Sequence, residues 1–414
     1  MRAPQWARDI EPGQWFRISG DRPDLDLPST PSGTRYLADG DPARDRSLNP
    51  PLDLKERVRR ALGRDWLAPW RGRTGFSAIT EAWNSAVFAT RHGPSGSMVI
   101  FGGGHTTYFG SDVHAFDLAS RQWKRLTTGF VTGRPREYGE DAVYESSTYP
   151  DGSPLPPHTY DYVQYDPVGN DYLLLKGQTE LGPNVTATPI PHLFNLDSLA
   201  WRHGPRHPTA ILNSGGFTTW DPKRRILWGH SGDDGGGNAF VGYSPDSENP
   251  DGTTGSWREF HPNKFPGKAN HNAMQYEPSA DRIIVALHCD DRLATIDPGE
   301  PRKPPEALAS KGERPVIQPY AALEYAPSLD SLVYYSPLHG PTVYCITLRG
   351  SAEWRILARE SLLDPIKDAA GQSRHPVNIA HTFGRFRIAS FAEFDLAILV
   401  RHVDTPVYVM RLPD

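Results

Sequence analysis

A phrase of polar and apolar positions recurs along the chain. Each copy has an aromatic residue, a short residue and a proline, followed by a few turn residues and a run of apolar residues. The intervals between successive full copies are 55, 56 and 49 residues. The full copies begin at Tyr165, Trp220, Tyr276 and Tyr325, and looser copies begin at Phe88 and Phe391. A repeat of this length is typical of propeller blades built from four strands.

Each copy predicts the inner half of one blade. The proline presets φ in a tight turn between the innermost strand and the apolar second strand. A third strand such as SDVHAFDL follows, and then a fourth strand that carries a tryptophan. The tryptophans of these fourth strands are Trp123, Trp201, Trp257 and Trp354. Tryptophans at this period are expected to pack between blades rather than to bind a ligand. The sequence therefore predicts an all-β fold, a β-propeller of kelch-like blades.

The two ends of the chain are predicted to share one blade. The C-terminal segment supplies three strands, around residues 386–391, 396–403 and 406–412, and the N-terminal segment GQWFRI supplies a fourth that includes Trp15. Their pairing would close the ring and remove an open sheet edge. We count six repeats and treat residues 1–414 as a single propeller domain. Residues 20–77 do not follow the blade pattern, and we expect a non-blade extension there, either a lid or a surface loop.

Composition and charge narrow the range of partners. The chain has 38 Gly, 40 Pro, 11 Trp and 17 Tyr, which suits many turns and aromatic strands. A net charge of -5 argues against nucleic acid or an anionic membrane as the main partner, although a local basic pocket would still suit an acidic ligand. We find no apolar run long enough to span a bilayer and no signal peptide. Cys289 and Cys345 do not form a disulfide framework. We expect a monomer.

Histidines gather on one face of the predicted ring. The turn entering the innermost strand and the turn leaving the second strand open on the same face, around the central channel. Most of the 15 histidines stand at such positions. The main residues of this predicted rim are Asn84, His105, His158, Tyr160, Lys176, His230, His271, His288, Cys289, Tyr320, His381 and Arg385. The mouth of a closed β architecture is the expected place for a ligand.

Four rim residues from the first two blades suit β-elimination from a uronic acid. Asn84 and Lys176 would neutralise the substrate carboxylate, which acidifies the neighbouring C5 proton. His105 would take that proton, and Tyr160 would donate one to the departing O4. A hydrolase would instead need two carboxylates across the scissile bond. Further candidates for substrate binding are His158, His230, Tyr108 and Arg385.

The segments EAWNSAVF, FGGGHTTYFG and PPHTYDYVQYDPVGNDYLLLKG resemble the propeller-type polysaccharide lyases, which include ulvan lyases and a lyase acting on rhamnosyl-glucuronate ends of plant gum. The resemblance covers about residues 78–180. Asn84 and His105 are 21 residues apart and Tyr160 and Lys176 are 16 apart, which is similar to the spacing of the family's site residues. Two positions depart from the family. Asn84 replaces a histidine and cannot serve as a second base, and Lys176 replaces an arginine and loses bidentate carboxylate binding.

The resemblance implies seven blades, an acidic polysaccharide or oligosaccharide as substrate, and catalysis without a cofactor. It also implies a secreted or periplasmic protein, although the sequence shows no signal peptide. Members of the family can hold a structural metal ion such as zinc or calcium. The candidate ligands in this chain are His271, Cys289 and His381, but the sequence has no CxxC or HxxxH pair.

Three other functions remain open from the sequence. The first is a non-catalytic kelch propeller that binds a glycan or a protein. The second is a glycoside hydrolase. The third, a copper radical oxidase, is disfavoured because Tyr344 and Cys345 are neighbours in one predicted strand, so their side chains point to opposite faces.

Overall fold

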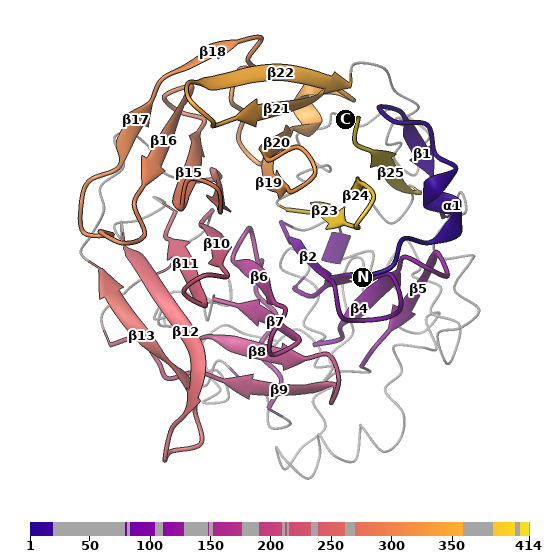
Figure 1. Cartoon of the computed structure of the whole chain (residues 1–414). Coiled ribbons are helices and arrows are strands. Elements are labelled where there is room, and N and C mark those ends of the chain that lie inside the picture. The colour runs from indigo at the N-terminus through magenta and orange to yellow at the C-terminus, as the bar shows by residue number, and fades with distance from the viewer. Residues whose placement is uncertain are drawn as a thin grey trace, which may run out of the picture.

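The computed structural model describes residues 1–19, 79–80, 83–103, 111–127, 148, 152–175, 190–208, 212, 215–232, 239–260, 270–358, 384–401 and 406–413. They form six antiparallel blades arranged in a ring around a central axis (Figure 1). The predicted six-bladed β-propeller is confirmed, whereas the described residues contain no seventh blade of the kind that the resemblance implied. The extension expected at residues 20–77 falls outside the described ranges.

The first three blades follow the chain from the centre of the ring to its edge. Blade 1 consists of β2 (Ala86–Ala89), β3 (Ser97–Ile100), β4 (His114–Asp117) and β5 (Gln122–Arg125). Blade 2 consists of β6 (Val163–Asp166), β7 (Asp171–Leu174), β8 (His192–Asn195) and β9 (Ala200–His203). Blade 3 consists of β10 (Phe217–Asp221), β11 (Ile226–His230), β12 (Phe240–Glu248) and β13 (Thr254–Phe260).

The next two blades are joined by a short added strand. Blade 4 consists of β14 (Ala273–Glu277), β15 (Arg282–Leu287), β16 (Arg292–Ile296) and β17 (Glu306–Leu308). Blade 5 consists of β19 (Ala322–Ala326), β20 (Ser331–Tyr335), β21 (Val343–Thr347) and β22 (Ala352–Ala358). Between the two blades, β18 (Ser310–Gly312) pairs in parallel with the start of β22 and covers part of the outer edge of blade 5. A 3-10 turn, η2 (Pro337–His339), precedes β21.

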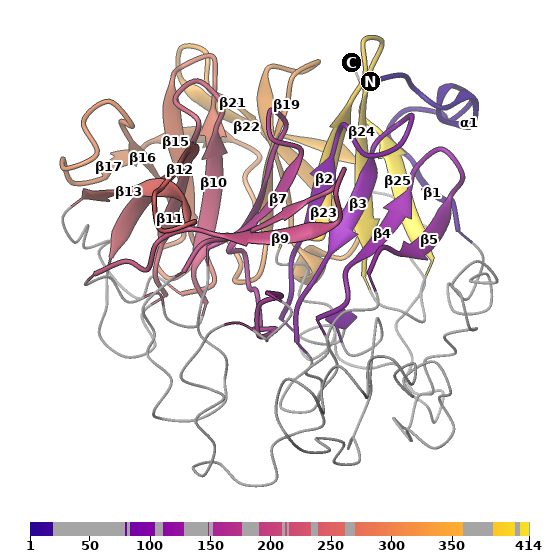
Figure 2. The same cartoon turned by 90° about the horizontal axis from the view of Figure 1, so that it is seen from below.

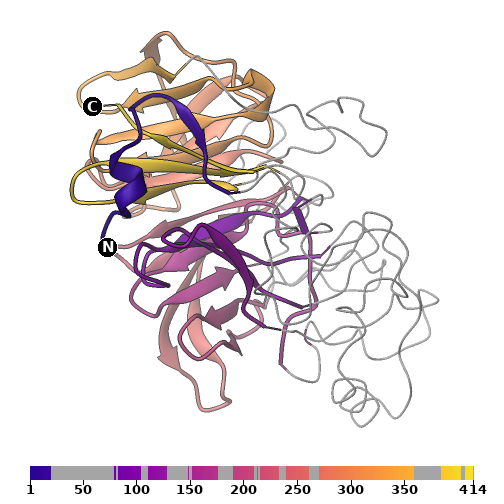
Figure 3. The same cartoon turned by 90° about the vertical axis from the view of Figure 1, so that its right-hand side faces the viewer.

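Blade 6 is built from both ends of the chain. It consists of β23 (Phe386–Ser390), β24 (Asp395–Val400), β25 (Val407–Arg411) and the N-terminal β1 (Trp15–Arg17). The pairing of Trp15 with Met410 sets the register of β1 on β25. Both chain ends lie on the same face of the ring (Figures 2 and 3). The predicted closure of the ring is therefore confirmed, including the position of Trp15 in the outermost strand.

Burial explains why inner and outer strands have different patterns. All four residues of β7 are buried because an inner strand is covered by a blade on each face, so its sequence reads as a continuous apolar run. In the outermost β5, only Trp123 is buried, and the residues on either side of it face outward. The hydrophobic clusters join neighbouring blades: Trp354 packs in one cluster with residues of blade 4.

The short N-terminal helix α1 (Gln5–Arg8) extends one of these inter-blade clusters. Ala7 is fully buried and packs in one cluster with Phe394 of blade 6 and Phe88 of blade 1. No helix in the part of the chain that the structure describes is long and apolar enough to cross a membrane.

Where the repeated phrase has an acidic residue before its proline, that acid holds the turn between the two inner strands. In blade 2, the carboxylate of Asp166 accepts hydrogen bonds from the main-chain N–H groups of Val168 (2.9 Å) and Gly169 (3.1 Å). Asp221 accepts the same two bonds in blade 3, each 3.0 Å long. A short acid that accepts from the backbone two and three residues further on stabilises a tight turn. The phrase therefore marks the turn that joins the first and second strands of a blade. This turn lies on the face of the ring opposite to the one where the innermost strands begin.

Candidate functional site

The entrance to the innermost strand has the same backbone geometry in most blades. The residue five positions before the aromatic residue of the phrase has a left-handed backbone in blades 2 to 5, and the residue that enters β23 of blade 6 does too. These residues are Tyr160 (φ 45°), Gly215 (φ 75°), His271 (φ 58°), Tyr320 (φ 64°) and Gly384 (φ 80°). Main-chain hydrogen bonds join several of these positions around the channel. Tyr160 donates to Trp83, His271 to Gly215, and Tyr320 to His271.

Glycine adopts this conformation without strain, but an aromatic side chain does not. The left-handed region costs a residue with a Cβ roughly 1–2 kcal/mol. Blades 3 and 6 use Gly215 and Gly384 there, whereas Tyr160, His271 and Tyr320 carry rings at the same place. Strained residues of this kind cluster at functional sites. The three strained rings therefore mark this face of the channel as the candidate site.

The rings form a continuous series along the channel mouth, which we call the aromatic arc: Trp83, Tyr160, His271 and Tyr320. Trp83 stacks on Tyr160, with ring centroids 6.0 Å apart and an interplanar angle of 15°. The centroids of Tyr160 and His271 are 5.8 Å apart, and those of His271 and Tyr320 are 4.5 Å apart. Trp83, His271 and Tyr320 are half-buried, whereas Tyr160 is 3% exposed.

Two glycines allow close packing at this face, one beside the arc and one beside Ser85 and Asp161. A Cβ on Gly215 would lie 2.9 Å from Cε1 of His271, so the missing side chain lets that imidazole approach Tyr160 across blade 3. A Cβ on Gly384 would lie 2.4 Å from Oγ of Ser85 and 2.5 Å from Oδ1 of Asp161. Both glycines are thus required by close packing as well as by their backbone angles.

Tyr160 lies beside Asn84, as the alignment of the first two blades predicts. The two residues form an isolated parallel bridge, and the ring of His158 lies 6.0 Å from that of Tyr160. His158 is 3% exposed and its ring also contacts Trp83 edge-on at 5.1 Å. The structure thus places a tyrosine between two imidazoles, those of His158 and His271.

The role expected for Asn84 is not supported by its contacts. Its amide nitrogen donates to the main-chain oxygens of Ile79 and Gly103, both at 2.9 Å, and its amide oxygen accepts from the N–H of Thr159 at 2.8 Å. Asn84 is fully buried. Both amide protons are used within the protein, so neither is directed to a substrate carboxylate. Asn84 holds the start of blade 1 to the segment that carries Tyr160.

A buried ionic cluster lies directly beside the arc at the start of the innermost strands. Arg387 of blade 6 pairs with Glu324 of blade 5 and with Asp161 of blade 2, the latter at 3.3 Å. Its guanidinium also donates to Oγ of Ser85 (3.2 Å) and to the main-chain oxygen of Ala86 (2.7 Å) in blade 1. A single side chain thereby joins four blades across the channel.

Two buried carboxylates share one guanidinium in this cluster. Burial raises the pKa of Asp161 to about 8, although the positive charge of Arg387 acts in the opposite direction. Burial also raises the pKa of Glu324. Asp161 directly follows Tyr160 in the chain, so a carboxyl group of this cluster lies next to the candidate site. No sequence pattern indicates this cluster, because its members come from distant parts of the chain.

Two other predicted substrate-binding residues lie in the interior. Arg385 is fully buried and donates to the main-chain oxygens of Val400 (3.1 Å) and Asn84 (2.8 Å), and burial lowers its pKa to about 9. His230, at the end of β11, is fully buried, and its ring stacks on Phe217 at 5.2 Å and 12°. Neither side chain reaches the surface, so direct substrate binding by Arg385 and His230 is not supported.

Four predicted site residues, His105, Tyr108, Lys176 and His381, fall outside the described ranges. His271 and Cys289, the remaining candidate metal ligands, are not part of any group of three or more metal-ligand side chains within the described residues. Cys289 is exposed, and its Sγ lies 3.2 Å from Nδ1 of His288. The metal site stays a prediction that depends on His381. Of the residues in the arc, sequence reasoning missed only Trp83, which directly precedes Asn84.

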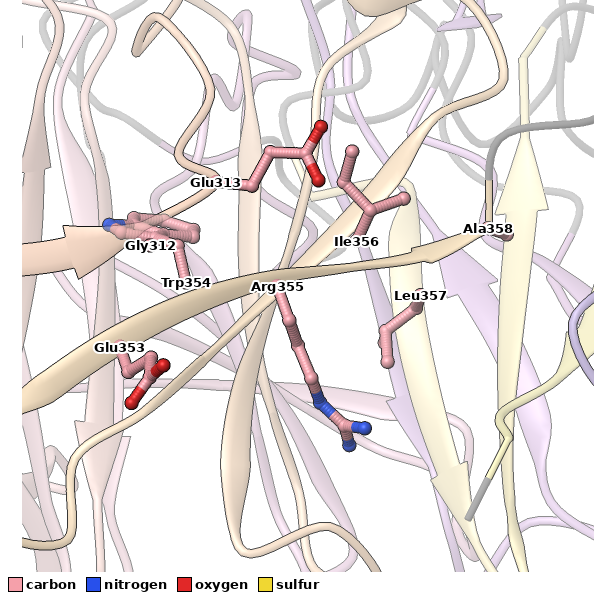
Figure 4. A pocket seen from close by; sticks show the side chains of 8 residues that line it. All are labelled: Gly312, Glu313, Glu353, Trp354, Arg355, Ile356, Leu357 and Ala358. Atoms are coloured by element: carbon pink, nitrogen blue, oxygen red, sulfur yellow. The ribbon is translucent and has the colours of Figure 1, made fainter.

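A pocket of about 580 Å³ lies elsewhere, on the outer strand β22 of blade 5 (Figure 4). Its lining includes Glu313, Trp354 and Arg355, and the side chains of Glu313 and Arg355 point to opposite sides of β22 in Figure 4. It is wide open to solvent, and its charged groups do not converge on one point. We therefore take the channel mouth, not this pocket, as the candidate site.

The comparisons with known proteins found only low similarity among the structures named below. No protein-family model and no curated protein matches the chain. Among solved structures, YjhT has a TM-score of 0.43 and 11% identity, over 66% of this chain and 83% of that chain. An auxiliary nutrient binding protein from Bacteroides ovatus has a TM-score of 0.45 and 10% identity, over 81% of this chain and 70% of that one. Similarity this low says nothing of a ligand or an activity.

Proposed function

We propose that the channel mouth binds an acidic glycan and cleaves it by β-elimination, with Tyr160 as the catalytic residue of the described part of the site. The observation that carries this proposal is the strained backbone of Tyr160, whose ring is held between the imidazoles of His158 and His271. A phenol can act as a general acid, and both imidazoles contact the ring of this tyrosine.

The proposed reaction needs no added reactant. A base removes the C5 proton of a uronate, the electron pair forms the C4–C5 double bond, and the C4–O4 bond breaks. The Tyr160 hydroxyl gives its proton to O4, so the products are a new sugar end and an unsaturated uronate. His105 remains the predicted base. Since the amide protons of Asn84 are already used, neutralisation of the carboxylate would fall to Lys176.

The test is product formation from a panel of uronate polysaccharides, followed by the ultraviolet absorbance of the unsaturated end. Tyr160→Phe removes the hydroxyl and keeps the ring, and we expect turnover to fall at least about a hundredfold. Tyr165→Phe is the matched control in the same blade. It removes bonds to Asn170 (2.7 Å) and Arg91 (3.1 Å) at the opposite end of the strand, so it should lower stability without lowering turnover.

A non-catalytic glycan-binding propeller is the second candidate, because half-buried rings at a channel mouth suit sugar binding with or without catalysis. Binding without any unsaturated product from wild-type protein would support this candidate against the lyase. New reducing ends without unsaturation would point to hydrolysis instead. Full activity in Tyr160→Phe would remove Tyr160 from the mechanism.

A further inference from the structure

The aromatic arc continues well beyond Tyr160. Trp83 and Tyr160 belong to blades 1 and 2, whereas His271 and Tyr320 belong to blades 4 and 5. Blade 3 contributes Gly215 between them and therefore no ring. The result is two pairs of rings on either side of the Gly215 position, joined by the contact between Tyr160 and His271.

The backbone alone does not require rings at the blade 4 and blade 5 positions. Gly215 and Gly384 hold the equivalent left-handed positions in blades 3 and 6 with no side chain at all. His271 and Tyr320 take up the same strained conformation and add half-buried rings whose centroids are 4.5 Å apart. A side chain kept at an energetic cost, where glycine would serve the fold, suggests that its ring has a function.

The chemistry of the pair suits a sugar ring. Tyr and His are partly apolar side chains that carry polar atoms, and a half-buried ring of this kind has an apolar surface anchored on the core with a polar group near water. Tyr320 packs against the hydrophobic cluster that also contains Tyr160. A pyranose has apolar C–H faces and hydroxyl edges, so such a pair fits one sugar unit.

We propose that His271 and Tyr320 form a second sugar-binding subsite, so that the mouth binds an oligosaccharide across blades 1 to 5 rather than a single uronate. This inference rests on the proposed function for the chemical class of the ligand. It adds that chain length matters: sugar units beyond the cleaved one bind on blades 4 and 5. His271 and Tyr320 are thereby specificity-determining residues.

The fold itself suggests the variants for the test. His271→Gly and Tyr320→Gly each remove one ring and place at that position the residue that blades 3 and 6 already use. Neither change should lower the melting temperature through the backbone, because glycine relieves the left-handed strain. Leu199→Gly is the matched control: Leu199 has φ 54°, is 41% exposed and stands in the turn between β8 and β9, away from the arc.

The probes are a disaccharide and a hexasaccharide that contain glucuronic acid, with binding measured by calorimetry on the full-length chain. We expect Tyr320→Gly to weaken hexasaccharide binding about tenfold and to leave disaccharide binding unchanged. Leu199→Gly should leave both affinities unchanged. Equal hexasaccharide affinity in wild type and both arc variants would overturn the second subsite, and so would the absence of binding by wild type.

This test separates the subsite from the lyase. Hexasaccharide binding that depends on Tyr320, without any unsaturated product, would keep the subsite and remove the lyase. Product formation that is unaffected by either glycine substitution would keep the lyase and remove the subsite. A large fall in melting temperature in both variants would show that the two rings serve only the core.

Discussion

The amide N–H of His271 donates a 2.6 Å hydrogen bond to the carbonyl oxygen of Gly215, and the imidazole of the same histidine lies against the glycine. A Cβ on Gly215 would be 2.9 Å from Cε1 of His271 and 2.9 Å from Cβ of Asn270. The position of His271 at the channel mouth thus depends on a residue of the neighbouring blade that has no side chain.

Gly215→Ala should therefore cost more than the backbone strain alone. The left-handed φ of 75° and the contact with His271 act together, so we expect a loss of at least about 2 kcal/mol and a displaced imidazole. Gly252→Ala is the control. Its φ is 81° and nothing lies within 4 Å of the added Cβ, so only the strain of roughly 1 kcal/mol remains. Denaturant unfolding of both variants measures the difference, and equal losses would contradict a close contact at Gly215.

Asp161 should contribute a loss of stability as pH rises. The pKa of this carboxyl is raised from 3.8 to about 8 by burial, so the folded state holds a proton that the unfolded state releases between those values. A raised acid pKa makes folding take up a proton, and stability is then lost as pH increases through this window. The slope for one such group is at most about 1.4 kcal/mol per pH unit.

The variant Asp161→Asn tests this sign. An amide keeps an oxygen that can accept from Ser85 and Arg387 but does not titrate, so the dependence on pH should become shallower. Burial also raises the pKa of Glu324, which faces the same arginine, so Glu324 contributes to the slope in the same direction. Asp251→Asn is the control, since this exposed carboxyl has a lowered pKa and stays ionised through the window. Denaturant unfolding at about pH 5 and about pH 8 gives the slopes. An identical slope in Asp161→Asn would show that Asp161 is not the group responsible.

Local patterns in the sequence were enough to predict most of the fold. The phrase beginning at Tyr165 specifies a turn because its acid and proline act within a few residues, and Trp15 could be assigned to the last blade because it repeats the position of Trp354. The cluster around Arg387 could not be predicted in this way. Arg387 and Asp161 are 226 residues apart, and their contact depends on which side chains of the inner strands face the channel.

The site was only partly predictable for a related reason. The alignment of the blades predicts one rim for Tyr160, His271 and Tyr320. It does not predict their left-handed backbone, because no sequence pattern indicates that conformation in a residue other than glycine. Asn84 shows the converse limit. The residue type does not show whether an asparagine at the start of a strand binds a ligand or bonds to the main chain. Only its contacts distinguish the two roles.

Trp15→Ala should open the ring at its closure. Trp15 is 1% exposed, contacts the rings of Tyr335 and Phe386 at 6.1 and 6.4 Å, and donates from Nε1 to the main-chain oxygen of Pro341 at 3.1 Å. Removing a buried tryptophan costs about 3–5 kcal/mol. Trp6→Ala, in the same N-terminal segment but half-buried, should cost less. Thermal unfolding compares the two, and equal melting temperatures would contradict closure through Trp15.

Asn84→Ala distinguishes a structural amide from a substrate-binding one. The substitution leaves the main-chain groups of Ile79, Gly103 and Thr159 without their partner, at roughly 1–3 kcal/mol for each buried group that stays unsatisfied. We therefore expect a large fall in melting temperature. Asn249→Ala is the control, because Asn249 also bonds to the main chain, at Gly255 (2.9 Å), but lies in the partly exposed turn between β12 and β13.

The deciding experiment measures two quantities for each variant: the melting temperature, and the turnover of a uronate polysaccharide per folded molecule. A structural Asn84 predicts that the melting temperature falls more than in Asn249→Ala, because its three bonds are fully buried. If Asn84 instead neutralised a substrate carboxylate, turnover would drop while the melting temperature stayed that of wild type. In that case the amide must turn from Ile79 and Gly103 toward the ligand when the ligand binds.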